Sequence, residues 1–325
     1  MTQTTQKTRL TRRILATVFL ISMITVRPAH AWWNGGHEIV AYIAYQNLTP
    51  ATRARVDALI KLNPMYAQWT VDVEDSQKPL VAFMMAATWP DCIKSAACEA
   101  GYTSDGGNTP PGQPTDDQNI GYADKLMHQY WHFVDTPYSA GAPGQPPKTP
   151  DAYTEIVKLS AAIATDESDD IKSYDVVWLE HLVGDIHQPL HATSRFTSNH
   201  PNGDAGGNLV YFCNLPCTDE LHAYWDGLFG DTPTIEQLSE NARVLLRHPK
   251  PAGTESLDVQ TWVNGSFDLA KSAVYQPPIS TDSDPSVKLS PRPNAAYRSR
   301  ANRVANEQVL LAGYRLANLL NTKLK

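Results

Sequence analysis

The segment from Trp178 to His191 constrains this chain most, because it sets three histidines and an aspartate among apolar residues. A buried imidazole or carboxylate is costly unless it has a partner, so these groups must be satisfied together. The spacing predicts a helix over 173–186, which places His181 and Asp185 on one face as an i, i+4 pair. A proline then ends the helix, and the chain carries His191 around the following turn.

A second pair of the same kind lies at 221–226, where His222 and Asp226 are again four residues apart with apolar neighbours. One histidine in an apolar helix is more often a hydrogen-bonded structural residue. Two His/Asp pairs together with His191 favour another interpretation, because imidazole nitrogen and carboxylate oxygen are the donors that zinc takes. The sequence therefore predicts that these groups converge on metal ions.

Residues 1–31 have the composition of a secretory signal peptide. Basic residues lie near the start, a short apolar run covers 14–26, and an A-x-A cleavage motif ends at Ala31. The apolar run is too short for an ordinary membrane span, although an N-terminal membrane anchor is the alternative interpretation. We expect cleavage after Ala31, which leaves 32–325 as a single mature domain that is secreted or periplasmic.

The charge of the protein depends on the removal of this leader. The whole chain has 27 basic and 34 acidic residues, a formal net charge of −7. The leader holds five of the basic residues and no acidic one, so the mature chain has 22 basic against 34 acidic residues, or −12. This charge argues against nucleic-acid binding through a broad basic surface. It does not exclude an enzyme whose attraction for phosphate comes from bound metal ions.

The four cysteines are typical of an oxidising compartment. We expect disulfide bonds between Cys92 and Cys98 and between Cys213 and Cys217, each closing a short loop near a candidate ligand. Four cysteines allow three pairings, and the sequence alone does not choose among them.

Apolar residues recur at helical spacing through most of the mature chain. Helices are predicted at 37–48, 50–62, 80–89, 151–165, 173–186, 233–247, 258–275 and 294–324. The run at 130–135 fits either a strand or a helix, and 208–212 is predicted as a short strand of a hairpin. No β-α-β alternation and no internal repeat is visible. We therefore expect one all-α, mainly helical domain with at most a short β-hairpin.

Common catalytic motifs are missing from the sequence. It has no phosphate-cradling glycine-rich loop, no G-x-S-x-G nucleophile elbow and no H-E-x-x-H zinc motif. The candidate metal ligands are the strongest chemical signal, and three more precede the central segment: His37, Asp91 and His132. Asp91 taken alone also fits a turn aspartate.

In order, the chain shows a Trp at the mature N-terminus, a His five residues later, an Asp, H-F-x-D, H-x3-D-x5-H, G-G-N and L-H-x-x-W-D. This succession, which spans 32–226 and is followed by a helical tail, resembles the zinc-dependent type I nuclease family (the S1/P1 nucleases). The resemblance implies the mainly α-helical fold shared with zinc phospholipases C. It also implies an endonuclease that cleaves RNA and single-stranded DNA to 5′-phosphate products and releases phosphate from 3′-nucleotides.

The resemblance further implies three zinc ions per chain, and every ligand position carries the expected residue type. The first zinc would bind Asp91, His132, His181 and Asp185. The second would bind His191, His222 and Asp226. The third would bind the α-amino nitrogen and carbonyl oxygen of Trp32, with His37 and Asp185. Asp185 would bridge two ions, and Asp91 and Asp185 are the expected catalytic residues.

Three more residues match substrate-binding positions of the family. Phe133 and Asp135 would stack on and hydrogen-bond a nucleobase, and Asn208 lies in the G-G-N element. An aromatic face is the usual platform for an unpaired base, while core packing is the alternative for Phe133.

Zinc lowers the pKa of water so that hydroxide forms near neutral pH, which makes a side-chain nucleophile unnecessary. We expect a monomer without a stable protein partner.

Two other functions fit part of the sequence. A zinc phospholipase C would share the scaffold, but a base pocket made by Phe133 and Asp135 argues against it. A secreted, non-enzymatic zinc-binding protein would use closed four-ligand sites, whereas His191, His222 and Asp226 supply only three ligands. An open coordination position is typical of a catalytic zinc.

Overall fold

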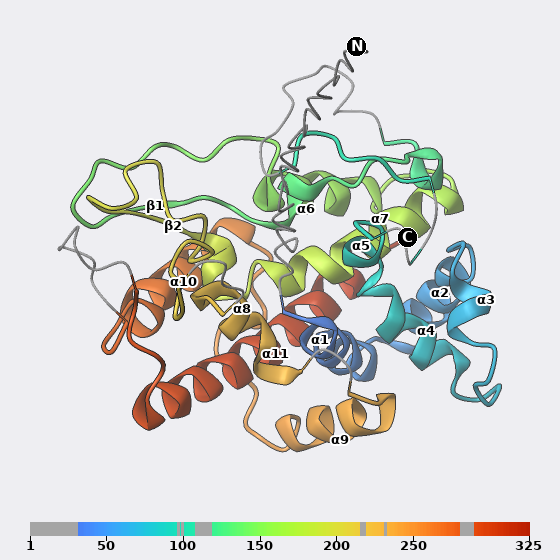
Figure 1. Ribbon diagram of the computed structural model, residues 1–325. Coiled ribbons are helices and arrows are strands. Elements are labelled where there is room, and N and C mark those ends of the chain that lie inside the picture. Colours follow the sequence, from blue (N-terminus) through green and yellow to red (C-terminus); the bar gives the residue numbers. More distant parts are fainter. Residues whose placement is uncertain are drawn as a thin grey trace, which may run out of the picture.

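A computed structural model of the protein describes residues 32–95, 98, 101–107, 119–214, 219–230, 233–279 and 289–325. Within these ranges the architecture is built from helices packed around a buried central helix (Figure 1). The prediction of a mainly helical domain is therefore confirmed. The predicted leader at 1–31 lies outside the described residues.

Helix α7 (Asp169–Asp185) is the centre of the fold. The Ser168 side chain caps its first turn by accepting a hydrogen bond from the Ile171 amide, and every residue from Lys172 to the end of the helix is buried. A helix that is buried on all sides needs neighbours on all sides. These neighbours are α1 (Asn34–Gln46), α2 (Pro50–Ile60), α6 (Ala152–Ala162) and α11 (Ala295–Lys323). Together they shield the ionisable residues of α7 from water.

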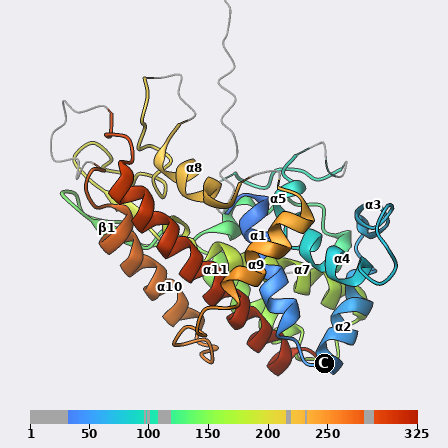
Figure 2. The ribbon, with the colours of Figure 1, turned by 90° about the horizontal axis from the view of Figure 1, so that it is seen from below.

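The long helix α11 runs along α1 (Figure 2). Gly313 permits this close approach, because a Cβ atom there would lie 2.5 Å from Ile43 Cγ2 and 3.0 Å from the Val40 carbonyl oxygen. Helices α4 (Lys78–Ala86) and α9 (Ile235–Leu245) pack against α1 as well. As a result α1 is buried from Gly35 to Tyr45.

Side-chain caps start several helices where the sequence predicts them. Thr49 accepts a hydrogen bond from the Thr52 amide at the start of α2, and Asp151 forms a capping box with Thr154 at the start of α6. The remaining α-helices are α3 (Tyr66–Trp69), α5 (Trp89–Cys92), α8 (Leu221–Asp226) and α10 (Val259–Leu269). Short 3₁₀ helices cover Gly121–Ala123, Gln129–His132, Pro189–Ala192 and Gly227–Phe229.

The structure shows which secondary structure two of the predicted segments adopt. The run at 130–135 is the end of the 3₁₀ helix Gln129–His132 followed by extended backbone. The helix predicted over 258–275 is α10 continued by a π-helical turn at Ala270–Val274.

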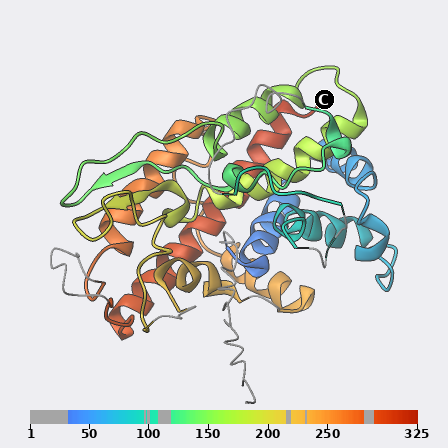
Figure 3. The ribbon, with the colours of Figure 1, turned by 45° about the horizontal axis from the view of Figure 1, so that its top comes forward.

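The β structure differs from the predicted hairpin. Strands β1 (Pro137–Ser139) and β2 (Ser194–Phe196) pair in parallel at one end of the molecule (Figure 3). Parallel strands cannot be joined by a tight turn, and here the connection runs through α6 and α7. The two strands therefore tie the segment before α6 to the segment after α7.

The hairpin expected around 208–212 is reduced to one antiparallel bridge between Tyr211 and Glu220. The preceding loop turns sharply, because Gly206 and Gly207 have φ angles of 60° and 86°. This left-handed conformation favours glycine and turns the backbone sharply just before the predicted strand.

The disulfide bond between Cys92 and Cys98 is present, as predicted. The other predicted pair includes Cys217, which lies outside the described residues. None of the described helices has both the length and the apolar composition that a membrane crossing requires.

We predict that Gly313→Ala destabilises the protein and that Gly265→Ala does not. The Cβ atom added at position 313 would force α11 away from α1, and such overpacking costs on the order of 1–3 kcal/mol. Gly265 lies in α10 with no heavy atom within 4 Å of an added Cβ, so alanine there should raise the free energy of unfolding by about 0.5–1 kcal/mol. Chemical denaturation measures both effects. Equal free energies of unfolding for the two variants would contradict the close α1–α11 contact.

Candidate metal centre

The predicted ligand side chains come from separate elements and meet in one buried region. They are His37 of α1, Asp91 of α5, His132 of the 3₁₀ helix Gln129–His132, His181 and Asp185 of α7, His191 of the 3₁₀ helix Pro189–Ala192, and His222 and Asp226 of α8. They form three clusters, in each of which one ligand atom per residue lies within 4.8 Å of the others. The clusters are His37–His181–Asp185, Asp91–His132–His181 and His191–His222–Asp226.

Asp185 lies between the first two clusters. Its Oδ1 is 3.2 Å from His37 Nε2, and its Oδ2 is 3.0 Å from His132 Nδ1. The same Oδ2 is 3.2 Å from His181 Nε2, one helical turn away on α7 as the spacing predicts. Asp91 Oδ1 is 3.6 Å from both His132 Nδ1 and His181 Nε2. One carboxylate thus faces three imidazoles from three different elements.

Main-chain carbonyl groups fix which ring nitrogen of three histidines faces inward. The Nδ1 atoms of His181, His191 and His222 each donate a hydrogen bond of 2.6–2.7 Å, to the carbonyl oxygens of Ala87, His132 and Gly206, respectively. A neutral imidazole with a proton on Nδ1 has a lone pair on Nε2. The three Nε2 atoms therefore face the clusters as electron-pair donors, which is how such carbonyls orient metal-binding histidines.

The distances between these inward-facing atoms require a cation or a proton. His191 Nε2 and His222 Nε2 are 3.0 Å apart, and Asp226 Oδ2 lies 3.3 Å from His222 Nε2. Two lone pairs and a carboxylate at this separation repel one another in a buried site unless a positive charge lies between them. Imidazole nitrogens and carboxylate oxygens suit zinc and related divalent ions. The residues therefore fit a metal centre.

Burial keeps several of these imidazoles neutral. It lowers the pKa of His37 to about 4 and the pKa values of His132 and His222 to about 3. Their lone pairs are thus free of protons near neutral pH, as metal binding requires. Asp185 is different, because burial favours its neutral form but the charge of His181 and hydrogen bonds from the histidines hold its pKa well below the usual value.

Two polar side chains at the centre were not predicted. The buried Lys94 Nζ donates a hydrogen bond of 2.8 Å to Asp91 Oδ1. Gln188 Nε2 donates to Asp226 Oδ1 at 2.7 Å. Lys94 follows Asp91 by three residues, and Gln188 lies within the histidine-rich segment, so both could have been noticed from spacing. A buried lysine in particular needs a partner.

The predicted substrate residues lie near the clusters but not in them. Phe133 is half-buried and directly follows a cluster histidine, and burial raises the pKa of Asp135 to about 6. The Asn208 amide donates to the main chain of its own loop at 2.7 Å. The Gly206 carbonyl of that loop orients His222. A role of Phe133, Asp135 and Asn208 in substrate binding stays a prediction.

The start of the predicted mature chain lies beside α8. The Trp33 amide donates to the Asp226 carbonyl at 3.0 Å, and Trp32 is fully buried with its ring against Phe229. Gly36 makes this possible, because a Cβ atom there would lie only 2.4 Å from Trp32 Cβ. The backbone of Trp32 is therefore held close to α8, which carries the candidate ligands His222 and Asp226.

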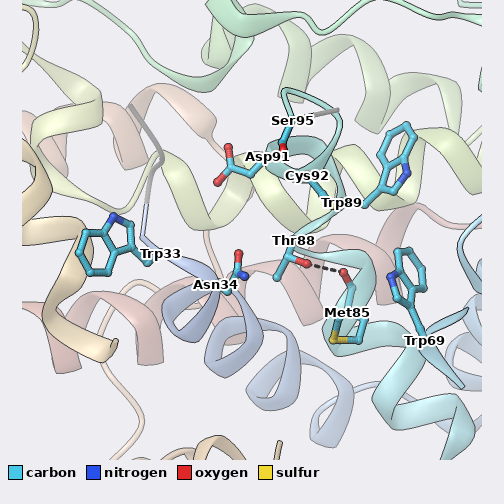
Figure 4. Close-up of a pocket in the computed structure, with 9 residues that line it drawn as sticks. All are labelled: Trp33, Asn34, Trp69, Met85, Thr88, Trp89, Asp91, Cys92 and Ser95. Atoms are coloured by element: carbon cyan, nitrogen blue, oxygen red, sulfur yellow. Dashed lines mark hydrogen bonds between the residues drawn. The ribbon is translucent and has the colours of Figure 1, made fainter. Parts of the chain in front are cut away.

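A pocket of about 240 Å³ lies beside Asp91 (Figure 4). Trp33, Trp69 and Met85 contribute apolar surface to it, and Asp91 contributes the link to the metal clusters. None of the predicted substrate residues lines this pocket.

Comparison with known proteins agrees with the resemblance inferred from the motifs. A sequence model of the family described as S1/P1 Nuclease matches residues 32–325. Nuclease S1 of Aspergillus oryzae is 25% identical to the chain over 305 residues, which are 90% of this chain and 91% of that protein. The family match covers every predicted ligand position and the whole described structure. The chain therefore belongs to the S1/P1 nuclease family.

Proposed function

We propose that the mature chain is a zinc-dependent endonuclease that cleaves RNA and single-stranded DNA to 5′-phosphate products and also acts as a 3′-nucleotidase. Membership of the family supports the nuclease activity. The observation that carries the metal dependence is the set of three adjoining His/Asp clusters with inward-facing lone pairs. Such a concentration of electron-pair donors calls for several cations in one site.

In this proposal three zinc ions are held by nine residues. The first set is Asp91, His132, His181 and Asp185, the second is His191, His222 and Asp226, and the third is His37, Asp185 and the backbone of Trp32. The two oxygens of Asp185 face His37 and His132 separately, which supports a bridging role. Bound zinc would supply positive charge to the substrate phosphate and lower the pKa of water toward neutrality.

The protein's own side chains position and stabilise the substrate. Lys94 adds a fixed positive charge beside Asp91, where negative charge on a phosphate would develop. Phe133 would stack on a nucleobase, and Asp135, ionised above its raised pKa of about 6, would accept a hydrogen bond from the edge of that base. Asp91 and Asp185 would contribute to catalysis by binding the zinc ions and fixing their positions.

Removal of the predicted leader is part of the proposal. Cleavage after Ala31 would free the Trp32 amine, and only a free amine has a lone pair for zinc. The contact between the Trp33 amide and Asp226 holds this backbone beside the clusters. Export to the periplasm or the medium suits the Cys92–Cys98 disulfide, which is stable in an oxidising compartment.

The activity itself is tested with end-labelled RNA and single-stranded DNA. We expect cleavage to fragments with 5′-phosphate ends, release of phosphate from 3′-nucleotides, and three zinc ions per mature chain by elemental analysis. Chelation should stop the reaction, because the clusters carry no side-chain nucleophile. Products with 3′-phosphate ends, or active protein with one zinc or none, would overturn the proposal.

The terminal amine is tested by comparing three purified proteins: the mature chain, the same chain with one residue added before Trp32, and mature Trp32→Ala. The extension replaces the amine by an amide, so we expect the loss of one zinc ion and of most activity. Trp32→Ala keeps the backbone donors and should lose less. Mass spectrometry confirms each N-terminus. Three zinc ions and full activity in the extended chain would exclude the amine as a ligand.

The helix glycine beside His37 provides a further test. A Cβ atom at Gly184 would lie 2.8 Å from His37 Nδ1, and the α7 backbone is buried and cannot retreat. We predict that Gly184→Ala displaces the ring and lowers the zinc content by about one ion per chain. Gly265→Ala, a helical glycine with open space around it, is the matched control. Unchanged zinc content in Gly184→Ala would show that His37 is not a ligand.

A further inference from the structure

We propose that the pocket beside Asp91 binds a second nucleobase, on the side of the scissile phosphate opposite the base held at Phe133. This inference rests on the proposed nuclease function. Each phosphate within a nucleic-acid strand joins two nucleosides, and the residues Phe133 and Asp135 account for one of them. The pocket at Trp33 and Trp69 supplies a place for the other.

The first argument is the position of the pocket. Asp91 lines it, and the Oδ1 atom of the same residue lies 3.6 Å from both His132 Nδ1 and His181 Nε2. A ligand in the pocket is therefore adjacent to a phosphate bound at the metal clusters. Phe133 and Asp135 do not line this space, so the two base sites do not compete.

The second argument is the chemistry of the walls. In Figure 4 Trp33 lies on one side of the pocket, and Met85, Trp69 and Trp89 lie on the other. Among the described residues that line the pocket, Asp91 is the only ionisable one, and it is acidic. An acidic, mostly apolar pocket with three tryptophans disfavours a phosphate and favours the uncharged face of a base. A volume of about 240 Å³ is below the roughly 300–1,000 Å³ of pockets for drug-sized ligands, which suits one base.

The third argument is that the Trp33 ring is held in place before substrate arrives. The main-chain amide of Trp33 donates to the Asp226 carbonyl at 3.0 Å, and the Trp33 carbonyl accepts from the Gly36 amide at 2.8 Å. Its ring lies against Gly227, where a Cβ atom would be only 3.0 Å from Trp33 Cζ3. A larger residue at 227 would push the ring away. A fixed aromatic wall binds a base at a lower entropic cost than a mobile one.

The exposed Asn34 adds a polar group to the pocket. Its side-chain amide has both a donor and an acceptor, and the edge of every base offers matching groups. Stacking on an aromatic ring tolerates any base, whereas this amide contact would adjust the preference among them.

The experiment uses two substrates that differ by one nucleoside. The dinucleoside phosphate ApA has a base on each side of its phosphate, whereas 3′-AMP has only one. We compare the ratio of kcat/KM for ApA to kcat/KM for 3′-AMP in the zinc-loaded wild type, Trp69→Ala and Trp69→Phe. The matched control is Tyr66→Ala, which changes a half-buried aromatic residue of the same short helix α3 outside the pocket lining.

We expect Trp69→Ala to lower this ratio by roughly 5- to 150-fold, the range for one stacked base. Trp69→Phe should restore most of the ratio, and Tyr66→Ala should leave it unchanged. Asn34→Ala, a substitution at an exposed position, should lower it by about 2- to 10-fold, the range for one hydrogen bond. This variant keeps the test valid if Trp69→Ala does not fold.

Calorimetric binding of a phosphorothioate dinucleotide, which resists hydrolysis, separates the two possible failures. A wild type that cleaves both substrates, with ratio and dinucleotide Kd unchanged in Trp69→Ala and Asn34→Ala, would overturn the second base site and leave the nuclease proposal intact. A wild type that cleaves neither substrate would overturn the nuclease proposal. In that case the dinucleotide Kd decides on the second base site. A Kd that is weakened in the pocket variants and unchanged in Tyr66→Ala would support the site, and a Kd unchanged in all variants would overturn it as well.

Discussion

The convergence of buried electron-pair donors around α7 is the constraint on which the rest of the structure depends. His181 and Asp185 lie on a helix that is buried on every side, and the other candidate ligands approach from five further elements. Nitrogen atoms 2.9–3.0 Å apart and neighbouring carboxylates repel one another without a cation. Bound metal ions would therefore stabilise the fold strongly, since structural zinc contributes about 10–16 kcal/mol and a whole domain is stable by only about 5–15 kcal/mol.

Irregular segments orient the ligands that the helices carry. The carbonyls of Ala87, His132 and Gly206 receive the Nδ1 protons of three histidines, and all three carbonyls lie at helix ends or in loops. Carbonyls within a helix are already hydrogen-bonded, so only chain that leaves regular structure offers free acceptors. The tight turn at Gly206 is one such case.

Local charge and aromatic surface outweigh the charge of the whole chain. The mature sequence has 22 basic against 34 acidic residues, yet its family acts on nucleic acid. Close to the clusters, cations and Lys94 would attract phosphate over short distances where screening by salt is weak. The tryptophans beside Asp91 would add affinity that does not depend on charge. An acidic protein can in this way bind a polyanion at one site without binding it everywhere.

The sequence by itself determined what depends on local spacing. The i, i+4 pairs of α7 and α8, the caps at Thr49 and Asp151 and the ordered ligand motifs all follow from periodicity within short segments. Tertiary structure decided the contacts between distant segments. It paired β1 with β2 in parallel, placed Trp33 and Trp69 around one pocket, and set Gly313 against Ile43. Such contacts depend on how helices pack in three dimensions. The spacing of residues within one segment does not determine that packing.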